Sequence, residues 1–156
     1  MIYTIMAILV LAADFVSKTA VSRLMTIGEK IELIPGFISF TYIRNKGIAW
    51  GMFANARILF IILTIAIIAV LCAVLIKKKI THPVGKTAVY LIISGAIGNL
   101  IDRVFYPDGV IDFICTEFMD FPIFNVADMA VCAGAALLIV YVLFFDTEKK
   151  DEDKRV

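Results

Sequence analysis

Two aspartates are the clearest candidates for chemistry in an otherwise apolar chain. Asp112 lies in a short apolar segment, and Asp128 lies sixteen residues further on, at the start of a long apolar run. A carboxylate at the edge of hydrocarbon costs free energy, so it is a candidate functional group whose partner should be sought. The alternative for Asp128 is structural, because an acid in the first turn of a helix complements the helix dipole.

Other reactive side chains are scarce. The chain has one histidine, His82, in a basic loop, and three cysteines with no close pair: Cys72, Cys115 and Cys132. We therefore expect no metal site, no cofactor held by such residues, no disulfide framework and no histidine-dependent nucleophile. Acid–base chemistry by carboxylates is the class of reaction that remains.

The composition is that of an integral membrane protein. Hydrophobic residues make up 62% of the 156 residues, and the mean hydropathy is +0.96. Both values are far above those of soluble domains. Fifteen basic and fourteen acidic residues nearly cancel, and no basic block is interleaved with aromatic residues, so we expect no nucleic-acid partner.

Four apolar segments are candidates for membrane-spanning helices. They cover residues 2–21, 58–76, 87–101 and 126–145. The first segment lacks a basic start and contains Asp14 and Lys18, which predicts a retained helix instead of a cleaved signal peptide. We expect a single four-helix transmembrane domain over residues 1–145 and a charged, solvated tail over residues 146–156.

The long connection between the first two helices has the pattern of a β-strand. In residues 37–43, Ile38, Phe40 and Tyr42 would share one strand face. We expect a small sheet on the membrane surface with these aromatic residues facing the headgroups. Residues 110–114, in the connection to the fourth helix, are the second strand-like segment.

Further polar residues occur near the ends of the predicted helices. Asp14 and Lys18 are one helical turn apart and can neutralise each other, either to fix the helix register or to support a site. Asn99, Asp102 and Arg103 share one face at the end of the third helix. A solvated helix end is one explanation, but these complementary groups can also form the amide and Asp–Arg network that we expect there.

The start of the fourth helix has a capping signature. Asn125 is placed to cap the helix and Asp128 falls at its third position, as in a capping box. The positive end of the helix dipole would favour the ionised form of Asp128. Elsewhere, Asn45 opens a segment with Gly47 and Gly51, which permit tight backbone turns, although Asn45 alone would be an ordinary turn residue.

The basic residues predict the orientation in the membrane. The short middle loop carries Lys77, Lys78, Lys79 and Lys86, so we place this loop and both termini in the cytoplasm. The two long loops then face outward. The polar residues described above converge at the outer membrane boundary.

Five ordered motifs resemble those of lipoprotein signal peptidase, also called signal peptidase II. They are residues 14–18, 45–51, 95–103, 110–113 and 124–128. The resemblance extends over nearly the whole chain. It implies an all-α membrane protein of the bacterial cytoplasmic membrane, with four transmembrane helices, a small extracytoplasmic β-cradle and an outer loop. The implied activity is that of an aspartic endopeptidase that cleaves prolipoproteins just before a diacylglyceryl-modified cysteine.

The resemblance also implies roles for individual residues. Asp112 and Asp128 match the catalytic pair. The polar residues around the pocket are matched by Asn45, Asn99, Arg103 and Asn125, with Gly47 in the same motif as Asn45. Supporting positions are matched by Asp14, Lys18 and Asp102. No cofactor is implied, the partners are lipid-modified prolipoproteins and membrane lipids, and a monomer is expected.

Three residues depart from the family pattern. Phe15 replaces a usual Gln, Ile48 a common Ala, and Met129 a usual Ser. None of these changes removes a catalytic carboxylate. They bear on the hydrogen bonds around the site and on the shape of the substrate groove.

An aspartic mechanism needs one ionised and one protonated carboxylate around a shared water, and we expect Asp128 to carry the charge and Asp112 the proton. One rival is a small transporter or proton channel. The carboxylates cluster at one face, however, and the second helix has no charge in its middle, so no polar relay crosses the bilayer. The other rival is a helix-packing subunit that uses the small-residue pairs Ser94–Gly98 and Ala130–Gly134, and it leaves both aspartates unused.

Overall fold

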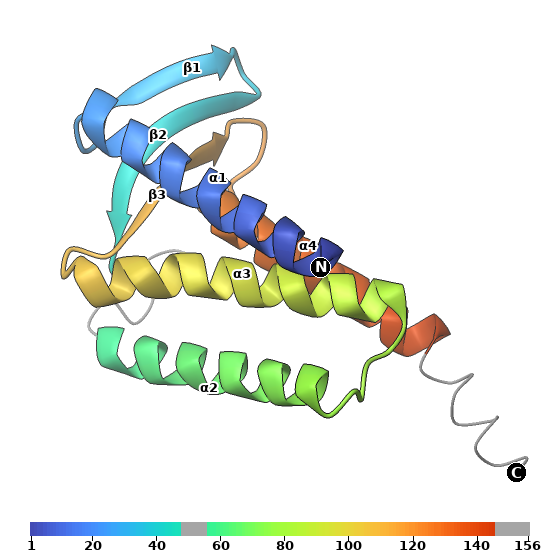
Figure 1. The fold of residues 1–156 in the computed structure, drawn as a ribbon. Coiled ribbons are helices and arrows are strands. Elements are labelled where there is room, and N and C mark those ends of the chain that lie inside the picture. Colours follow the sequence, from blue (N-terminus) through green and yellow to red (C-terminus); the bar gives the residue numbers. More distant parts are fainter. Residues whose placement is uncertain (48–55, 146–156) are drawn as a thin grey trace, which may run out of the picture.

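The computed structural model describes residues 1–47 and 56–145. Four helices run along a common direction, and a small sheet lies at one end of them (Figure 1). The helices are α1 (Ile2–Leu24), α2 (Arg57–Ile76), α3 (Pro83–Phe105) and α4 (Val126–Phe144), and the strands are β1 (Lys30–Ile34), β2 (Ile38–Asn45) and β3 (Val110–Thr116). We call the end where α1 and α3 finish and α2 and α4 begin the sheet end.

All four helices are long and apolar enough to cross a membrane. No residue of α2 is buried within the protein, and Ile58 is 73% exposed. Such a surface suits lipid and would be costly in water. The prediction of a multi-pass membrane protein, mostly helical with a small sheet, is therefore confirmed.

Helix α3 is longer than the apolar run predicted. It begins four residues earlier, where Pro83 occupies its first turn and the side chain of His82 accepts a hydrogen bond from the Val84 N–H. It also continues four residues further, to Phe105. Proline is compatible with the first turn of a helix because its missing N–H would have no partner there. The polar residues near Asn99 are thus inside a helix.

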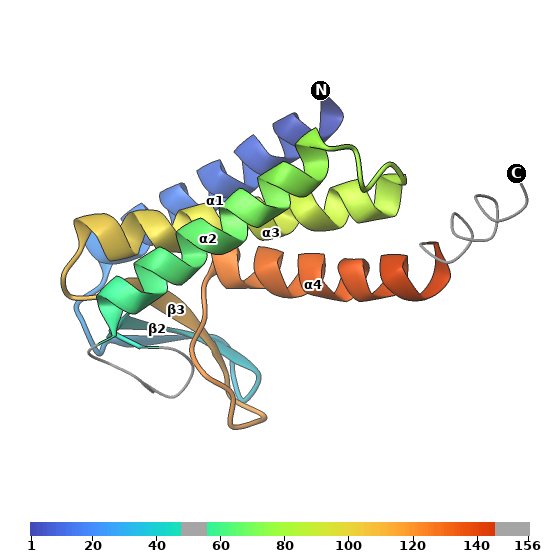
Figure 2. The same ribbon diagram turned by 90° about the horizontal axis from the view of Figure 1, so that it is seen from below.

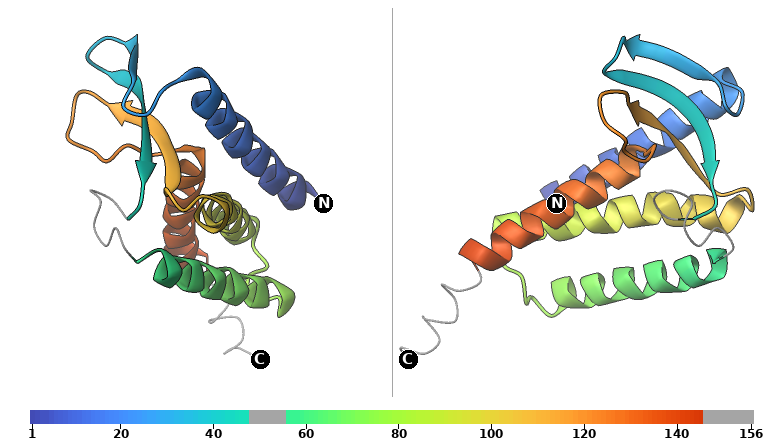
Figure 3. Two further views of the ribbon diagram at one scale, coloured as in Figure 1. Left: turned by 90° about the vertical axis from the view of Figure 1, so that its left-hand side faces the viewer. Right: turned by 180° about the vertical axis from the view of Figure 1, so that it is seen from behind.

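Helix α3 packs against each of the other three helices, as the views in Figures 2 and 3 show. Its approach to α4 depends on glycines. A Cβ at Gly95 would collide with the carbonyl oxygen of Ala127, and a Cβ at Gly134 would lie 2.7 Å from the Ile92 side chain. Small residues at these positions allow the two backbones to approach closely.

The sheet has the order β1-β2-β3 and is antiparallel throughout. Between Phe40 and Ile43 the register of β2 shifts against β3. Beyond the shift, Ile43 pairs with Asp112, and Asn45 lies two residues further along β2. Side chains two apart share a strand face, so Asn45 and Asp112 point to the same side of the sheet.

The expected orientation of the β2 aromatic residues is wrong. Tyr42 is buried in a cluster with Val21 of α1, with Met25 directly after α1, and with Ile111 and Phe113 of β3, and Phe40 packs against this cluster. The end of α1 lies beside the sheet (Figure 3), so this apolar face packs on protein. It therefore does not face lipid headgroups.

Candidate active site

The first turn of α4 fixes the position of Asp128. The Asn125 side-chain oxygen accepts from the Asp128 N–H at 2.9 Å, and Asp128 Oδ2 accepts from the Asn125 N–H at 3.1 Å. This reciprocal pair is the predicted capping box. Asp128 Oδ1 accepts from Asn99 Nδ2 at 2.7 Å. Both carboxylate oxygens therefore have a donor, which restricts rotation of the group.

Asp112 lies on strand β3 and is only 2% exposed. Its Oδ2 accepts from Asn45 Nδ2 at 2.8 Å, and its Oδ1 accepts from Asn125 Nδ2 at 2.7 Å. Burial, with a further contribution from the negative charge of Asp128, raises the pKa of Asp112 to about 7, against the lowering effect of the two amide hydrogen bonds. This carboxyl therefore keeps its proton up to near-neutral pH.

Two asparagines connect the carboxylates. Asn125 Nδ2 reaches both Asp112 Oδ1 and, at 3.0 Å, Asn99 Oδ1. Asn99 in turn donates to Asp128. The structure thus brings Asp112 and Asp128, from β3 and α4, into one hydrogen-bonded site with Asn45, Asn99 and Asn125.

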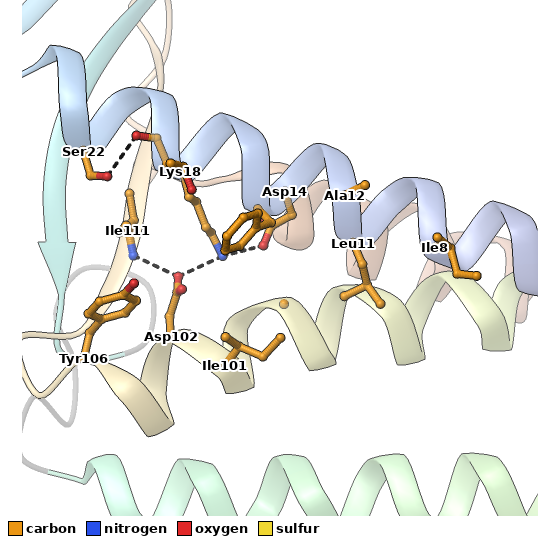
Figure 4. A pocket seen from close by; sticks show the side chains of 13 residues that line it. Ile8, Leu11, Ala12, Asp14, Lys18, Ser22, Ile101, Asp102, Tyr106 and Ile111 are labelled. Carbon is orange, nitrogen blue, oxygen red and sulfur yellow. Dashed lines mark hydrogen bonds and ion pairs between the residues drawn. The ribbon is translucent and has the colours of Figure 1, made fainter.

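Beneath this site, the ammonium group of Lys18 joins α1 to α3. Its Nζ lies 2.7 Å from Asp14 Oδ2, 2.9 Å from Asp102 Oδ2 and 3.1 Å from Asn99 Oδ1. Figure 4 shows the Lys18 ammonium between the two carboxylates, in the wall of a second cavity of about 390 Å³ between α1 and α3. Lys18 and both carboxylates are almost fully buried. The predicted Asp14–Lys18 pair is confirmed.

The same carboxylates also hold the backbone beside the two aspartates of the site. Asp14 Oδ1 accepts from the Ala127 N–H at 2.9 Å, next to Asp128. Asp102 Oδ2 accepts from the Ile111 N–H at 3.3 Å, next to Asp112. The Lys18 cluster therefore positions the chain on both sides of the candidate pair.

The expected Asp–Arg network at the end of α3 is wrong. Asp102 pairs with Lys18, whereas Arg103 donates to its own helix at Asn99 O, 3.4 Å away, and lies over the ring of Phe60. Adjacent residues of a helix point in directions about 100° apart. Asp102 therefore lines the second cavity, whereas Arg103 lines a different cavity, beside the candidate pair.

An open cavity of about 570 Å³ adjoins the candidate pair. Polar groups on its wall come from Asp112, Asp128, Asn45, Asn99 and Arg103, and Gly47 also lines it. The Gly47 N–H donates to Asn45 Oδ1 at 3.0 Å and so helps to orient that amide. Every predicted pocket residue except the fully buried Asn125 lines this cavity.

The remainder of the cavity wall is apolar, and the sequence predicted only some of its residues. It includes residues 121–124, Val110, Met129 and Cys132. Cys132 was not predicted to line the cavity, although its spacing of four from Asp128 places both residues on one helix face. An apolar wall beside paired carboxylates suits a substrate with an apolar segment.

The three departures from the family pattern differ in their relation to the site. Met129 lines the cavity and is 52% exposed. Phe15 lies on α1 in the second cavity and is 65% exposed. Ile48 lies outside the described residues, as does Gly51. Of the two departures that the structure describes, Met129 contacts the space beside the candidate pair and Phe15 does not.

Fold and site together define a multi-pass membrane protein with a carboxylate and amide site at the sheet end of its bundle. The family model described as Signal peptidase (SPase) II matches residues 6–144. A lipoprotein signal peptidase of Lactobacillus johnsonii is 38% identical over 143 residues, which are 92% of each chain. One from Listeria monocytogenes serotype 4b is 38% identical over 152 residues, 96% of this chain and 98% of the relative.

Two solved structures described as bacterial membrane enzymes are also similar. One, at 2.3 Å resolution, has a TM-score of 0.86 and 38% identity, and the match covers 90% of this chain and 87% of the other. The second, at 1.9 Å, has a TM-score of 0.83 and 37% identity, with coverages of 92% and 93%. The chain therefore belongs to the signal peptidase II family, and it is a membrane peptidase.

Proposed function

We propose that this protein cleaves the signal peptides of prolipoproteins just before a diacylglyceryl-modified cysteine, with Asp112 and Asp128 as the catalytic pair. Its relatives are named lipoprotein signal peptidases. The observation that carries the proposal for this chain is the junction at Asn125, which bonds to both carboxylates. Both groups line the same open cavity.

In the proposed reaction, Asp112 begins protonated and Asp128 ionised. Asp128 takes a proton from a water molecule whose oxygen attacks the scissile carbonyl carbon, while the Asp112 O–H donates to the carbonyl oxygen. The tetrahedral intermediate then collapses. Its C–N bond breaks as the leaving nitrogen receives the proton held by Asp128, and the products are a carboxyl and an amine.

The raised pKa of Asp112 supports this distribution of protons, because burial disfavours its ionised form. The capping box supports it at Asp128, since the positive end of α4 stabilises a negative charge. A carboxylic acid kept neutral near pH 7 can donate the hydrogen bond that polarises the carbonyl.

The other polar residues have positioning roles in this proposal. Arg103 lines the cavity with nitrogen atoms available to a substrate carbonyl, and Asn45, held by Gly47, orients Asp112. Asn99 donates to Asp128 and Asn125 donates to Asp112, so the two amides fix the positions of the carboxylates. Asp14, Lys18 and Asp102 fix the backbone from beneath and do not line this cavity.

We place the sheet end, and hence the site, near the outer face of the cytoplasmic membrane, with both termini in the cytoplasm. Water then reaches the carboxylates from outside. The apolar wall formed by residues such as Phe124 and Met129 lets the lipid-modified part of the substrate remain in the bilayer. The proposed enzyme works as a monomer and needs no metal.

The test is cleavage of a lipidated prolipoprotein peptide by the purified full-length protein. Asp112→Asn and Asp128→Asn should each lower kcat by about 10²- to 10⁴-fold. Asp108→Asn is the matched control, because Asp108 is exposed on the turn between α3 and β3. Wild-type rates in either dyad variant, with the protein folded, would overturn the proposed pair.

A further inference from the structure

Four cationic side chains gather where β2 ends, α2 begins and α3 ends. Arg44 and Lys46 come from the end of β2 and the residues after it, Arg57 is the first residue of α2, and Arg103 lies in the last turn of α3. Lys46, Arg57 and Arg103 line one small hollow with Tyr106. Arg44 lies over the ring of Tyr106, 4.9 Å from its centroid. We call these four cations the basic corner.

The acids nearby do not neutralise the basic corner. Within residues 1–47 and 56–145, the ion pairs are made by Lys18 and Lys30 alone. Residues 48–55, which join β2 to α2, contain no Asp or Glu. Asp108 is exposed on the neighbouring turn, and Arg103 is attracted electrostatically by Asp128, Asp112 and Asp102. Arg44, Lys46 and Arg57 form no ion pair within the described residues. Positive charge is therefore in excess at this corner.

Helix capping explains part of this cluster. Arg57 Nε donates to Arg103 O at 2.6 Å and Arg57 Nη2 to Val104 O at 3.0 Å, so Arg57 caps the last turn of α3. A helix C-terminus attracts cations. Yet Arg57 also begins α2, whose N-terminus has no acid in its first turn and no side-chain cap. Capping of α3 does not explain the presence of Arg44 and Lys46. The positive end of the α2 dipole adds to their charges.

The basic corner lies at the boundary of the membrane-spanning segments. Arg57 begins one candidate span, and Arg103 is two residues before the end of another. Figures 1 and 2 both show the start of α2 beside the end of α3. The ends of spanning helices lie at the level of the polar headgroups. Lipid phosphates are therefore at the height of the corner.

We propose that the basic corner binds the phosphate of an anionic membrane phospholipid. Guanidinium groups match phosphate oxygens in a bidentate manner, and basic residues next to a spanning helix attract anionic lipids. A lipid with net negative charge is preferred to a zwitterionic one, whose added cation would meet an already positive surface. Because Asn45 and Arg103 line both this hollow and the larger cavity, the bound lipid lies next to the candidate active site.

Native mass spectrometry of the purified full-length protein, titrated with equal amounts of phosphatidylglycerol and phosphatidylcholine, tests this proposal. Wild type should retain phosphatidylglycerol preferentially. Lys46→Gln should weaken that binding roughly fivefold and Arg57→Gln roughly tenfold. Arg23→Gln removes the same charge from the last turn of α1 and should leave the binding unchanged.

Arg57→Gln also removes the cap of α3, so Lys46→Gln decides the outcome if Arg57→Gln fails to fold. Lys46 is exposed. Equal retention of the two lipids by wild type, or an equal loss in Arg23→Gln, would overturn the proposal. Inorganic phosphate is added in a separate titration. If it binds as tightly as the lipid and is lost in the same variants, the ligand is free phosphate and the lipid assignment is wrong.

Discussion

Lys18 shows how much of the architecture depends on one side chain. Its ammonium is almost fully buried between Asp14 and Asp102 and also donates to Asn99. Because α1 and α3 supply these groups, the Lys18 ammonium holds two helices together. It also contacts Asn99, which donates to Asp128 in the site. A buried charge is tolerated only while its partners remain.

We therefore expect Lys18→Met to destabilise the protein by about 3–5 kcal/mol, since it leaves two carboxylates buried without a cation. The matched control is Lys30→Met, because Lys30 also pairs with two acids, Glu32 and Glu117, but its side chain is 43% exposed. Solvent screens such a pair. The thermal midpoint in detergent should fall only for Lys18→Met, and equal midpoints for the two variants would contradict the structural role of the cluster.

Asp112 gives the proposed reaction a specific pH dependence. Its pKa of about 7 means that it is protonated below pH 7 and loses its proton above it. The proposed reaction needs that proton, so kcat/KM for a lipidated peptide should fall by roughly tenfold per pH unit above about pH 7. Circular dichroism at each pH controls for unfolding. A rise in kcat/KM through pH 7 would show that the ionised form of Asp112 is the active one.

The sequence predicted some of these residue contacts and missed others for a physical reason. The capping box and the Asp14–Lys18 pair are local, so spacing along one helix was sufficient to predict them. The partner of Asp102 is 84 positions away in the chain, and helical spacing contains no information on such a distance. Arg103, its neighbour in sequence, points about 100° away from it around α3 and lines a different cavity.

At the scale of elements, α3 provides the surface on which the site is assembled. Its Gly98 faces both α1 and α4, and a Cβ there would lie 2.6 Å from Asp14 Oδ2 and 3.2 Å from the Cβ of Ala127. These neighbours are parts of the network that holds the start of α4. The space beside Gly98 is therefore occupied by the Asp14 carboxylate and the Ala127 side chain.

We expect Gly98→Ala to destabilise the protein by about 1–3 kcal/mol, because the added methyl group overpacks this junction. Ala135→Ser adds a single heavy atom on the exposed side of α4 and serves as the control. Thermal unfolding of both variants checks the prediction. A Gly98→Ala protein with wild-type midpoint and activity would show that the Asp14 side chain can move aside at no cost.

The helices were easier to predict than the sheet. Four apolar runs are long signals that persist over many residues, and each of them is a helix in the structure. The sheet is formed by short strands, and β1 has only five residues, all exposed. The orientation of Tyr42 depends on α1 packing over the sheet, which the strand pattern alone does not contain.

At the scale of the whole molecule, the four helices give the protein two different ends. The end that joins α2 to α3 is basic, with Lys77, Lys78 and Lys79 in its loop. The sheet end holds the network of carboxylates and amides. With four spans we expect both termini on one side of the membrane, and the positive-inside rule predicts that this side is the cytoplasm.

Reporter fusions measure this orientation directly. Green fluorescent protein folds in the bacterial cytoplasm, and alkaline phosphatase becomes active only outside it. Fusions after Val156 should fluoresce and lack phosphatase activity, whereas fusions after Glu117, which follows three spans and precedes α4, should show the reverse. Immunoblots control for expression. The opposite pattern would place Asp112 and Asp128 on the cytoplasmic side and would contradict the proposed orientation.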